Sequence, residues 1–263
     1  MMNRIDGKFK FLKEKNEKAM IAFITAGDPN LDTTIDVVLA MEVAGADIIE
    51  LGIPYSDPLA DGVIIQQSST RALNNGTKIS KIMNTVKEIR KNTEVPLVYL
   101  VYYNSVFKYG IEKFIKECSD VGIDGIIIPD LPIEERKDII EVADSYGVNL
   151  IPLVAPTSKK RIESIVNNGK GFVYCVSTNG VTGVRKELGT NIEEYMEVVS
   201  QYTNLPKAIG FGISGPDMAK ELKSYCDGVI LGSAIVRLFG EGLEKEELIT
   251  NVKNFVKSIK DVL

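Results

Sequence analysis

Two carboxylates, Glu50 and Asp61, lie eleven residues apart in the segment IIELGIPYSDPLADG. Glu50 stands in an apolar run, between Ile49 and Leu51, where the loss of water disfavours the charged form of an acid and raises its pKa. A carboxyl group with a raised pKa can act as a general acid near neutral pH. A buried acid paired with a Lys or Arg for structural reasons produces the same pattern, so the residue types alone leave both interpretations open.

Asp61 ends the proline-bearing loop that follows this apolar run. If the loop folds back, Asp61 faces the same cavity as Glu50, and two acids in different environments can take different roles. Asp57, which precedes Pro58, is more typical of a turn residue.

The residue types that are missing restrict the chemistry further. The chain has no histidine, which removes the usual general base and the commonest metal ligand. Lysine is absent from the carboxyl ends of the expected strands, which argues against a Schiff-base aldolase. The three cysteines, Cys118, Cys175 and Cys226, have no C-x-x-C spacing and suggest neither a disulfide framework nor a zinc site. Acid and base roles therefore fall to carboxylates, tyrosines or lysines, without a metal.

Composition and charge indicate a globular protein with small-molecule chemistry. The formal net charge of -5 over 263 residues argues against a nucleic-acid partner. No apolar run approaches the roughly 20 residues of a membrane span, and the first residues lack the apolar centre of a secretory signal. We expect a soluble, cytoplasmic protein that does not associate with membranes.

Short β-rich runs alternate with amphipathic helical segments along the whole chain, a pattern typical of a parallel sheet. Eight such repeats in this length favour an α/β fold of the closed (β/α)8 TIM-barrel type over an open sheet. Because no linker interrupts the pattern, residues 1–263 are expected to form a single (β/α)8 barrel domain. An extra helix around Phe9 to Lys18 is expected to cap the bottom of the barrel. The expected strands are Met20 to Thr25, Ile48 to Leu51, Leu97 to Tyr102, Gly125 to Ile128, Asn149 to Val154, Phe172 to Val176, Lys207 to Gly210 and Gly228 to Leu231.

Two glycine loops follow the last two expected strands, GFGISGPD at 210–217 and LGSAIV at 231–236. In this fold the loops after strands seven and eight, with a short extra helix, commonly bind a phosphate group. In the first loop, Ser214, Pro216 and Asp217 resemble a capped helix start. Simple turning of the chain by glycine is the alternative. Residues 177–191, rich in Gly, Ser, Thr and Asn, are expected to form a lid.

Six segments together identify the chain as similar to the α subunit of tryptophan synthase. These are FITAGDPN (23–30), ELGIPYSDPLADG (50–62), GIIIPDLP (125–132), STNGVTG (177–183), GFGIS (210–214) and LGSAIV (231–236). The resemblance implies a lyase of L-tryptophan biosynthesis that cleaves indole-3-glycerol phosphate to indole and glyceraldehyde 3-phosphate. It also implies no cofactor on this chain, and a β subunit that holds pyridoxal phosphate within an α2β2 heterotetramer.

The resemblance assigns roles to individual residues. Glu50 matches the catalytic acid-base glutamate and Asp61 the catalytic aspartate. Tyr174 matches a tyrosine that lines the substrate site, and Thr182 matches the lid residue that closes over Asp61. The phosphate-binding positions of the family fall on Gly183, Phe211, Gly212, Gly232 and Ser233.

The same chemistry fits the residues present. Protonation of the indole ring by Glu50 would create an electron sink within the substrate, and Asp61, kept ionised in a wetter loop, would stabilise the positive charge that develops on the ring. Apolar side chains that face the pocket are expected to hold the indole ring, namely Phe23, Leu100, Ile127 and Leu153. The sequence departs from the family at Thr178, where many members have an arginine, at Asn179, where a small residue is usual, and at Pro129, where an alanine is common.

The expected docking surface for the β subunit is formed by the loops that carry Pro54, Asp57, Pro58 and Asn104, although simple turn formation would explain these residues nearly as well. An alternative function is a weakly active or non-catalytic subunit that mainly activates a β partner dependent on pyridoxal phosphate. A further alternative is another phosphate-binding barrel, such as an isomerase or a thiamine-phosphate-type synthase.

Overall fold

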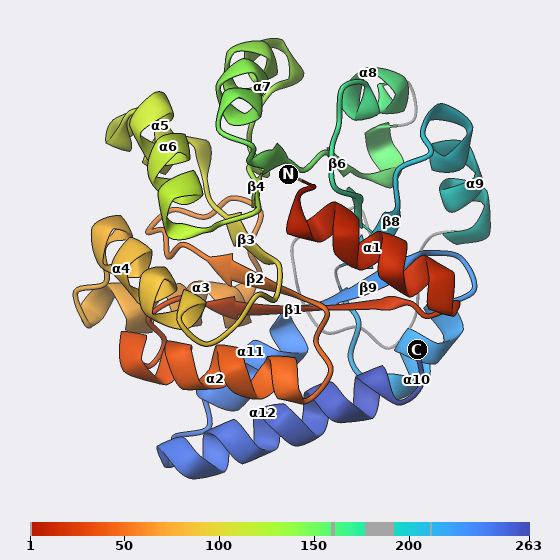
Figure 1. Cartoon of the computed structure of the whole chain (residues 1–263). Helices are drawn as coiled ribbons and strands as arrows, with labels where there is room; N and C mark the ends of the chain where they lie inside the picture. Colours follow the sequence, from red (N-terminus) through yellow and green to blue (C-terminus); the bar gives the residue numbers. More distant parts are fainter. Residues whose placement is uncertain (1, 159–160, 177–191, 211) are drawn as a thin grey trace.

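The computed structural model describes residues 2–158, 161–176, 192–210 and 212–263, and these residues form a parallel sheet ringed by helices (Figure 1). Strands alternate with helices along the chain, as the sequence predicts. In the described residues the α-helices and strands are, in order, α1 (Arg4–Lys15), β1 (Ala19–Thr25), α2 (Leu31–Val43), β2 (Ile48–Gly52), α3 (Val63–Asn74), α4 (Ile79–Arg90), β3 (Leu97–Leu100), α5 (Tyr103–Tyr109), α6 (Ile111–Val121), β4 (Gly125–Ile127), α7 (Arg136–Ser145), β5 (Asn149–Leu150), β6 (Leu153–Val154), α8 (Ile162–Val166), β7 (Val173–Val176), α9 (Ile192–Tyr202), β8 (Lys207–Gly210), α10 (Pro216–Leu222), β9 (Gly228–Leu231), α11 (Ser233–Phe239) and α12 (Lys245–Lys260).

The sheet closes on itself, which confirms the predicted barrel. The strand order is β5-β4-β3-β2-β1-β9-β8-β7-β6, so β5 and β6 are the two ends of the order, and only Ile151 and Pro152 separate them in the chain. The Ile151 N–H donates to the Ile126 carbonyl on one side at 2.9 Å, and the Pro152 carbonyl accepts from the Tyr174 N–H on the other at 2.9 Å. The predicted strand Asn149 to Val154 is therefore one barrel strand in two short pieces, divided where proline has no N–H to offer a neighbour.

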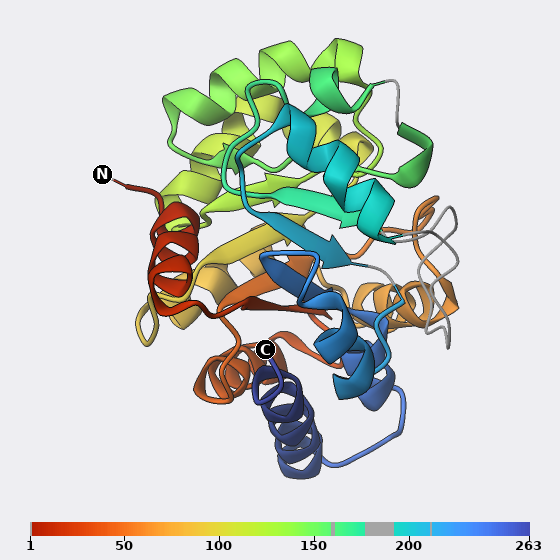
Figure 2. The same cartoon turned by 90° about the vertical axis from the view of Figure 1, so that its right-hand side faces the viewer.

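Helix α1 closes one end of the barrel, as predicted, but it begins five residues before the expected start and ends three residues before the expected end. The Asn3 side chain accepts a hydrogen bond from the Ile5 N–H and starts the helix, and Asn16 ends it in the left-handed conformation, with φ of 56°. The Phe9 ring lies 5.6 Å from that of Phe172, centroid to centroid. Figure 2 shows α1 at one end of the barrel, with the strand arrows pointing away from it.

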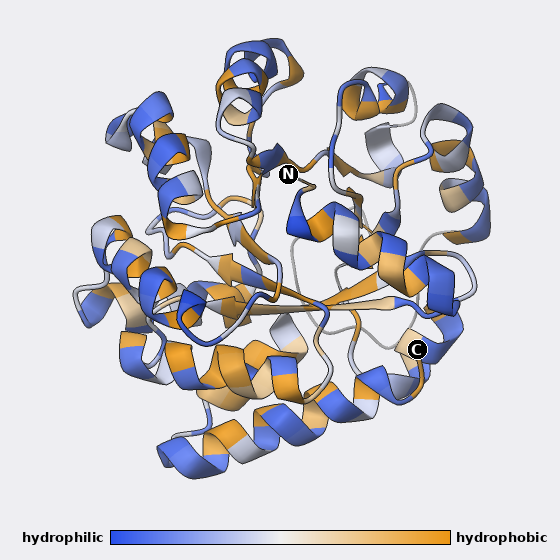
Figure 3. Cartoon of the chain, viewed as in Figure 1, coloured by the Kyte–Doolittle hydropathy of each residue, from blue (hydrophilic) through white to orange (hydrophobic). Residues whose placement is uncertain are grey.

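Apolar side chains fill two layers. The outer layer lies between the strands and the surrounding helices, and the inner layer contains Ile5, Phe9 and Leu12 of α1 together with inward-facing strand residues such as Ile48. Figure 3 shows hydrophobic residues along the strands and on the helix sides that face them, with hydrophilic residues on the outside. Since side chains of α1 fill the amino end of the barrel interior, the interior opens toward the carboxyl ends of the strands, where this fold class places its active sites.

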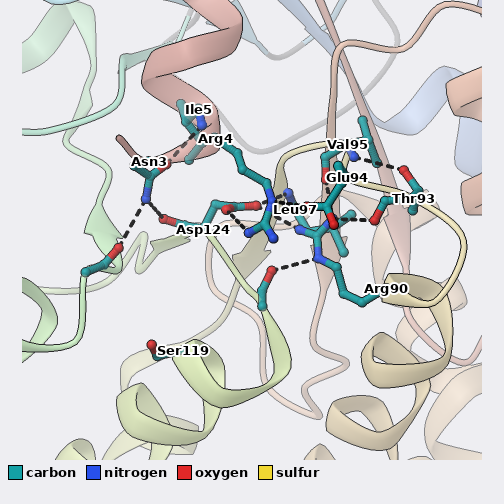
Figure 4. A network of polar contacts seen from close by, with 12 residues as sticks. Asn3, Arg4, Ile5, Arg90, Thr93, Glu94, Val95, Leu97, Ser119 and Asp124 are labelled. Atoms are coloured by element: carbon teal, nitrogen blue, oxygen red, sulfur yellow. Dashed lines mark hydrogen bonds and ion pairs between the residues drawn. The ribbon is translucent and has the colours of Figure 1, made fainter. Parts of the chain in front are cut away.

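A polar network at the amino end joins α1 and α4 to the sheet (Figure 4). Asp124 accepts hydrogen bonds from the Leu97 N–H at 2.8 Å, from Arg90 Nη2 at 2.8 Å and from Arg4 Nη1 at 2.9 Å. Both carboxylate oxygens thus have charged partners, which offsets the loss of water around this buried acid.

Candidate active site at the carboxyl ends of the strands

Glu50 lies on β2 with its carboxyl group inside the barrel, 1% exposed. Its neighbours across the sheet are Phe23 on β1 and Val98 on β3. Neither carboxyl oxygen has a hydrogen-bond partner, and no Lys or Arg pairs with it among the described residues. The interpretation of Glu50 as a structurally paired acid therefore has no support in the described part of the chain.

Burial is the main cause of the electrostatic character of Glu50. It raises the pKa of the carboxyl group to about 8, and repulsion from Asp61 acts in the same direction. The side chain consequently holds its proton at neutral pH, as a general acid requires.

Asp61 reaches the same cavity from the loop between β2 and α3. The Gln66 side chain donates to the Asp61 carbonyl at 2.7 Å and fixes the end of this loop. The expectation of a wetter environment is wrong, because the loop folds inward and leaves Asp61 only 8% exposed. Burial raises the pKa of Asp61 to about 6, opposed by a hydrogen bond from Tyr102. Its pKa still lies below that of Glu50, so the two acids differ in protonation near neutral pH.

Tyr102 connects Asp61 to the outer side of the loop. Its hydroxyl also accepts a hydrogen bond from the Ala60 N–H at 3.0 Å, and its ring stacks on Tyr55 with centroids 5.1 Å apart. The Tyr55 hydroxyl in turn accepts from Asn104 Nδ2 at 3.0 Å. The position of Asp61 is therefore held by a chain of contacts that ends at Asn104, at the start of α5.

The two acids share one cavity with most of the predicted apolar and glycine positions. Its empty volume is about 610 Å³, including the open side. The lining residues are Phe23, Glu50, Ala60, Asp61, Ile65, Leu100, Pro129, Leu153, Tyr174, Gly212, Ile213, Ile230, Gly232 and Ser233. Acids and apolar surface thus meet at the end of the barrel where the fold class places active sites.

Ile127 does not line this cavity, contrary to the prediction. It is fully buried in the inner layer, together with Ile5 and Ile151. Side chains alternate along a strand, so the next inward position after Ile127 is Pro129, and Pro129 does line the cavity.

Four lining residues were not predicted from the sequence, and one of them, Ala60, directly precedes Asp61 in its loop. Ile65 lies one helical turn beyond Asp61 at the start of α3, and Ile230 precedes Gly232 by two residues on the same strand face. The helical period relates Ile65 to Asp61, and the strand period relates Ile230 to Gly232. These two periods would have identified both isoleucines. Ile213 lies in the loop after β8, where no period applies.

Glycines next to two aromatic rings make room for them. A Cβ atom at Gly52 would lie 2.6 Å from the Phe23 ring, and one at Gly210 would lie 2.6 Å from the Tyr174 hydroxyl. Burial raises the pKa of Tyr174, so its hydroxyl stays protonated beside the two acids. The small residues at these strand ends allow both rings to form walls of the cavity.

Some of the candidate phosphate-binding positions lie in the described residues and others do not. Gly212, with φ of 83°, and Gly232 and Ser233 line the cavity, and Gly232 precedes the short helix α11. Helix α10 is capped by Gly215 without a side-chain hydrogen bond, so the expected capping role of Ser214 is wrong. Thr182, Gly183 and Phe211, the predicted lid 177–191, and the departures at Thr178 and Asn179 lie outside the described residues.

Apolar side chains are exposed near the site. Leu59, in the loop that carries Asp61, is 84% exposed, and Phe107 on α5 is 64% exposed. Among the described residues, no group of three or more Cys, Asp or Glu side chains could hold a metal ion. In that same part of the chain, no helix has the length and apolar character needed to cross a membrane.

Comparisons with known proteins agree on one family. The family model for the tryptophan synthase alpha chain matches residues 9–263. The chain is 67% identical to the tryptophan synthase alpha chain of Thermoanaerobacter sp. strain X514 and 62% identical to that of Clostridium kluyveri, each over 262 residues and the full length of both chains.

Solved structures give the same result. Tryptophan synthase subunit alpha from Legionella pneumophila matches with a TM-score of 0.89 at 31% identity, covering 100% of this chain and 98% of that one. A chain from the tryptophan synthase α2β2 complex of Pyrococcus furiosus matches with a TM-score of 0.82 at 34% identity, covering 92% of this chain and 98% of that one.

Proposed function

The chain belongs to the tryptophan synthase alpha chain family, and on this basis we propose that Glu50 and Asp61 carry out the alpha reaction of tryptophan biosynthesis. In that reaction a lyase cleaves indole-3-glycerol phosphate to indole and glyceraldehyde 3-phosphate. The observation that carries the proposal is the pair of acids in one cavity, with the pKa of Glu50 raised to about 8 and that of Asp61 to about 6.

Glu50 supplies the proton that starts the cleavage. Proton transfer from its carboxyl group to the third carbon of the indole ring turns the ring into an iminium-like electron sink. The bond from this carbon to the glycerol side chain can then break with its electron pair returning to the ring. No described residue forms a hydrogen bond with the Glu50 oxygens, which leaves the proton available for the substrate.

Asp61 stabilises the charge that develops during this step. Its carboxylate accepts a hydrogen bond from the indole N–H, whose positive character grows as the ring is protonated. The Glu50 carboxylate that remains removes the proton from the side-chain hydroxyl, directly or through water, and the aldehyde product forms. One acid therefore serves in both steps.

The rest of the cavity binds and orients the substrate. Phe23, Leu100 and Leu153 provide apolar surface for the planar ring, and Tyr174 adds a neutral aromatic wall. Gly212, Gly232 and Ser233 are proposed to bind the phosphate through backbone N–H groups. By resemblance alone, Thr182, Gly183 and Phe211 complete the site.

The chain is proposed to need no cofactor of its own and to work with a β subunit that holds pyridoxal phosphate, in an α2β2 heterotetramer. A relative in the family has been solved as an α2β2 complex. Exposed Leu59 and Phe107, beside Pro58 and Asn104, offer apolar surface for such a partner. We place the protein in the cytoplasm and treat residues 1–263 as a single domain.

Indole release from indole-3-glycerol phosphate tests the assignment. Glu50→Gln and Asp61→Asn should each abolish release by the purified chain while circular dichroism stays unchanged. Asp57→Asn is the matched control, because Asp57 lies in the same loop but is exposed and outside the cavity. Full turnover by the Glu50 variant would end the assignment.

The alternative of a subunit that mainly activates its partner predicts a different result. In that case indole release by the isolated chain would be negligible even in the unaltered protein, and addition of the chain would accelerate only the β reaction. Assays of both reactions with and without the β subunit distinguish the two.

A further inference from the structure

A second cavity lies outside the candidate active site, between α7, α8 and the divided strand formed by β5 and β6. Figure 1 shows α7 and α8 as neighbours on the same side of the barrel. The cavity has an empty volume of about 620 Å³, including its open side. It is lined by Ile128, Leu131, Pro132, Ile133, Arg136, Leu150, Ile151, Leu153, Arg161 and Ile165. Eight of these residues are apolar, and the two others are arginines.

Arg136 is a buried cation with no anionic partner in the part of the chain that the structure describes. It is the first residue of α7 and is only 8% exposed. Nη1 donates to the Ile165 carbonyl of α8 at 2.7 Å. Among the described residues, no carboxylate forms an ion pair with Arg136, and Nε and Nη2 have no hydrogen-bond partner.

The guanidinium nitrogens without a protein partner keep access to solvent through the open side of the cavity, so a ligand in the cavity can reach them. A charge that is largely buried without a counterion has lost part of its hydration and gains from an anion that replaces it. Burial also lowers the pKa of Arg136, and no acid counteracts the effect. An arginine remains charged at neutral pH despite such a shift, so the cavity wall carries a positive charge.

Arg161 adds a second positive charge to the same wall. It directly precedes α8, is exposed, and forms no ion pair with any described acid. The cavity therefore has two guanidinium groups and no acidic lining residue in the part of the chain that the structure describes. Its electrostatic potential favours an anion.

We propose that this cavity binds a small carboxylate with an apolar body. The planar guanidinium of Arg136 offers two parallel N–H donors, the geometry that a carboxylate matches. The apolar lining, which includes Leu131, Ile133 and Ile165, suits a hydrocarbon or aromatic body. A free phosphate dianion fits less well, because it would lose strong hydration and gain no apolar contact.

The site is separate from the candidate active site, although the two are close. Leu153 is the one described residue that lines both cavities. A carboxylate could also enter the active-site cavity, so an experiment has to report on each cavity separately. Isoleucine methyl groups allow this. Ile133 and Ile165 line the cavity that contains Arg136 and Arg161, called the arginine cavity below, whereas Ile65 and Ile213 line the active-site cavity.

Phenylacetate titration of the full chain, followed by NMR of ¹³C-labelled isoleucine methyl groups, tests the proposal. The signals of Ile133 and Ile165 should shift in a saturable way while those of Ile65 and Ile213 stay in place. Arg136→Gln should weaken binding by about tenfold or more, because a charge-assisted hydrogen-bond pair is lost. Lys137→Gln is the matched control, since Lys137 is the next residue on α7 and is exposed.

Arg161→Gln provides a second test of the cavity if the Arg136 variant does not fold. Arg161 is exposed, so its replacement should leave the fold intact and weaken phenylacetate binding by a few-fold. The proposal is overturned if Ile133 and Ile165 do not respond, if only Ile65 and Ile213 respond, or if both folded arginine variants bind as the unaltered chain does. Inorganic phosphate that binds as tightly as phenylacetate would overturn the carboxylate class.

Discussion

Replacement of Glu50 by Gln should stabilise the protein, and more so as the pH rises. Glu50 has a pKa of about 8 in the folded chain against an ordinary value of 4.5. The unfolded chain therefore releases this proton at lower pH than the folded chain does. The protonated Glu50 carboxyl group contributes fully to the free energy of unfolding below pH 4.5. This contribution is lost as the pH rises through 8. Gln has a similar shape and does not titrate.

The magnitude follows from the two pKa values. Each pKa unit corresponds to about 1.4 kcal/mol. The Gln variant should exceed the unaltered chain in free energy of unfolding by about 1 kcal/mol at pH 5, about 3 kcal/mol at pH 7 and about 5 kcal/mol at pH 9. The difference between the two proteins should follow Glu50 alone, because the other titrating groups affect both proteins alike.

Urea unfolding at these three pH values measures the difference. Glu88→Gln is the matched control, because Glu88 is an exposed acid on α4 and its replacement should change stability by less than about 0.5 kcal/mol at each pH. A stability difference for Glu50→Gln that stays constant with pH would refute the raised pKa. A less stable variant would mean that the folded chain stabilises the charged form of Glu50.

Three further substitutions test the surroundings. Asp61→Asn should lower the pKa of Glu50, because the Asp61 charge helps to raise it, and an unchanged value in ¹³C NMR of the Glu50 carboxyl group would show that burial acts alone. Tyr102→Phe should raise the pKa of Asp61, because the Asp61 carboxylate loses a hydrogen bond. The acidic limb of the pH profile of kcat/KM for indole formation should then move to higher pH, and a limb that does not move would contradict this. Asp124→Asn should destabilise the chain by about 3 kcal/mol in urea unfolding with kcat/KM unchanged. Loss of activity in the folded Asp124 variant would contradict its purely structural role.

The strands were predictable because they are buried on both faces. Continuous runs of Val, Ile and Leu, such as Leu97 onward and Gly228 to Leu231, are typical of a parallel sheet and gave strand positions close to those observed. Residues 207–210 and 228–231 match the observed β8 and β9 without change. The break in the fifth barrel strand depends on Pro152 and on the two different neighbours of that strand, and periodicity contains neither.

The position of Glu50 was predictable from its apolar neighbours, whereas the burial of Asp61 was not. A loop of prolines and polar residues usually faces water, whereas contacts with Gln66 and Tyr102 hold this one inward. Ile127 was predicted to face the pocket, but it lies one inward position deeper in the barrel than Pro129, which lines the cavity.

The arginine cavity gave no signal in the sequence at all. Arg136 and Arg161 stand 25 residues apart in segments that look like ordinary solvated helix starts. The fold places both guanidinium groups on one cavity, where a hydrogen bond from Arg136 to the Ile165 carbonyl joins α7 to α8. Tertiary contacts of this kind have no local sequence pattern.

The pH dependence of kcat/KM for indole formation tests the central claim most directly, because it links the proton on Glu50 to the bond that breaks. We expect kcat/KM to hold to about pH 8 and then to fall by about tenfold for each further pH unit, as the free chain loses the Glu50 proton. A value of kcat/KM that stays level through pH 10 would show that this proton takes no part in the cleavage.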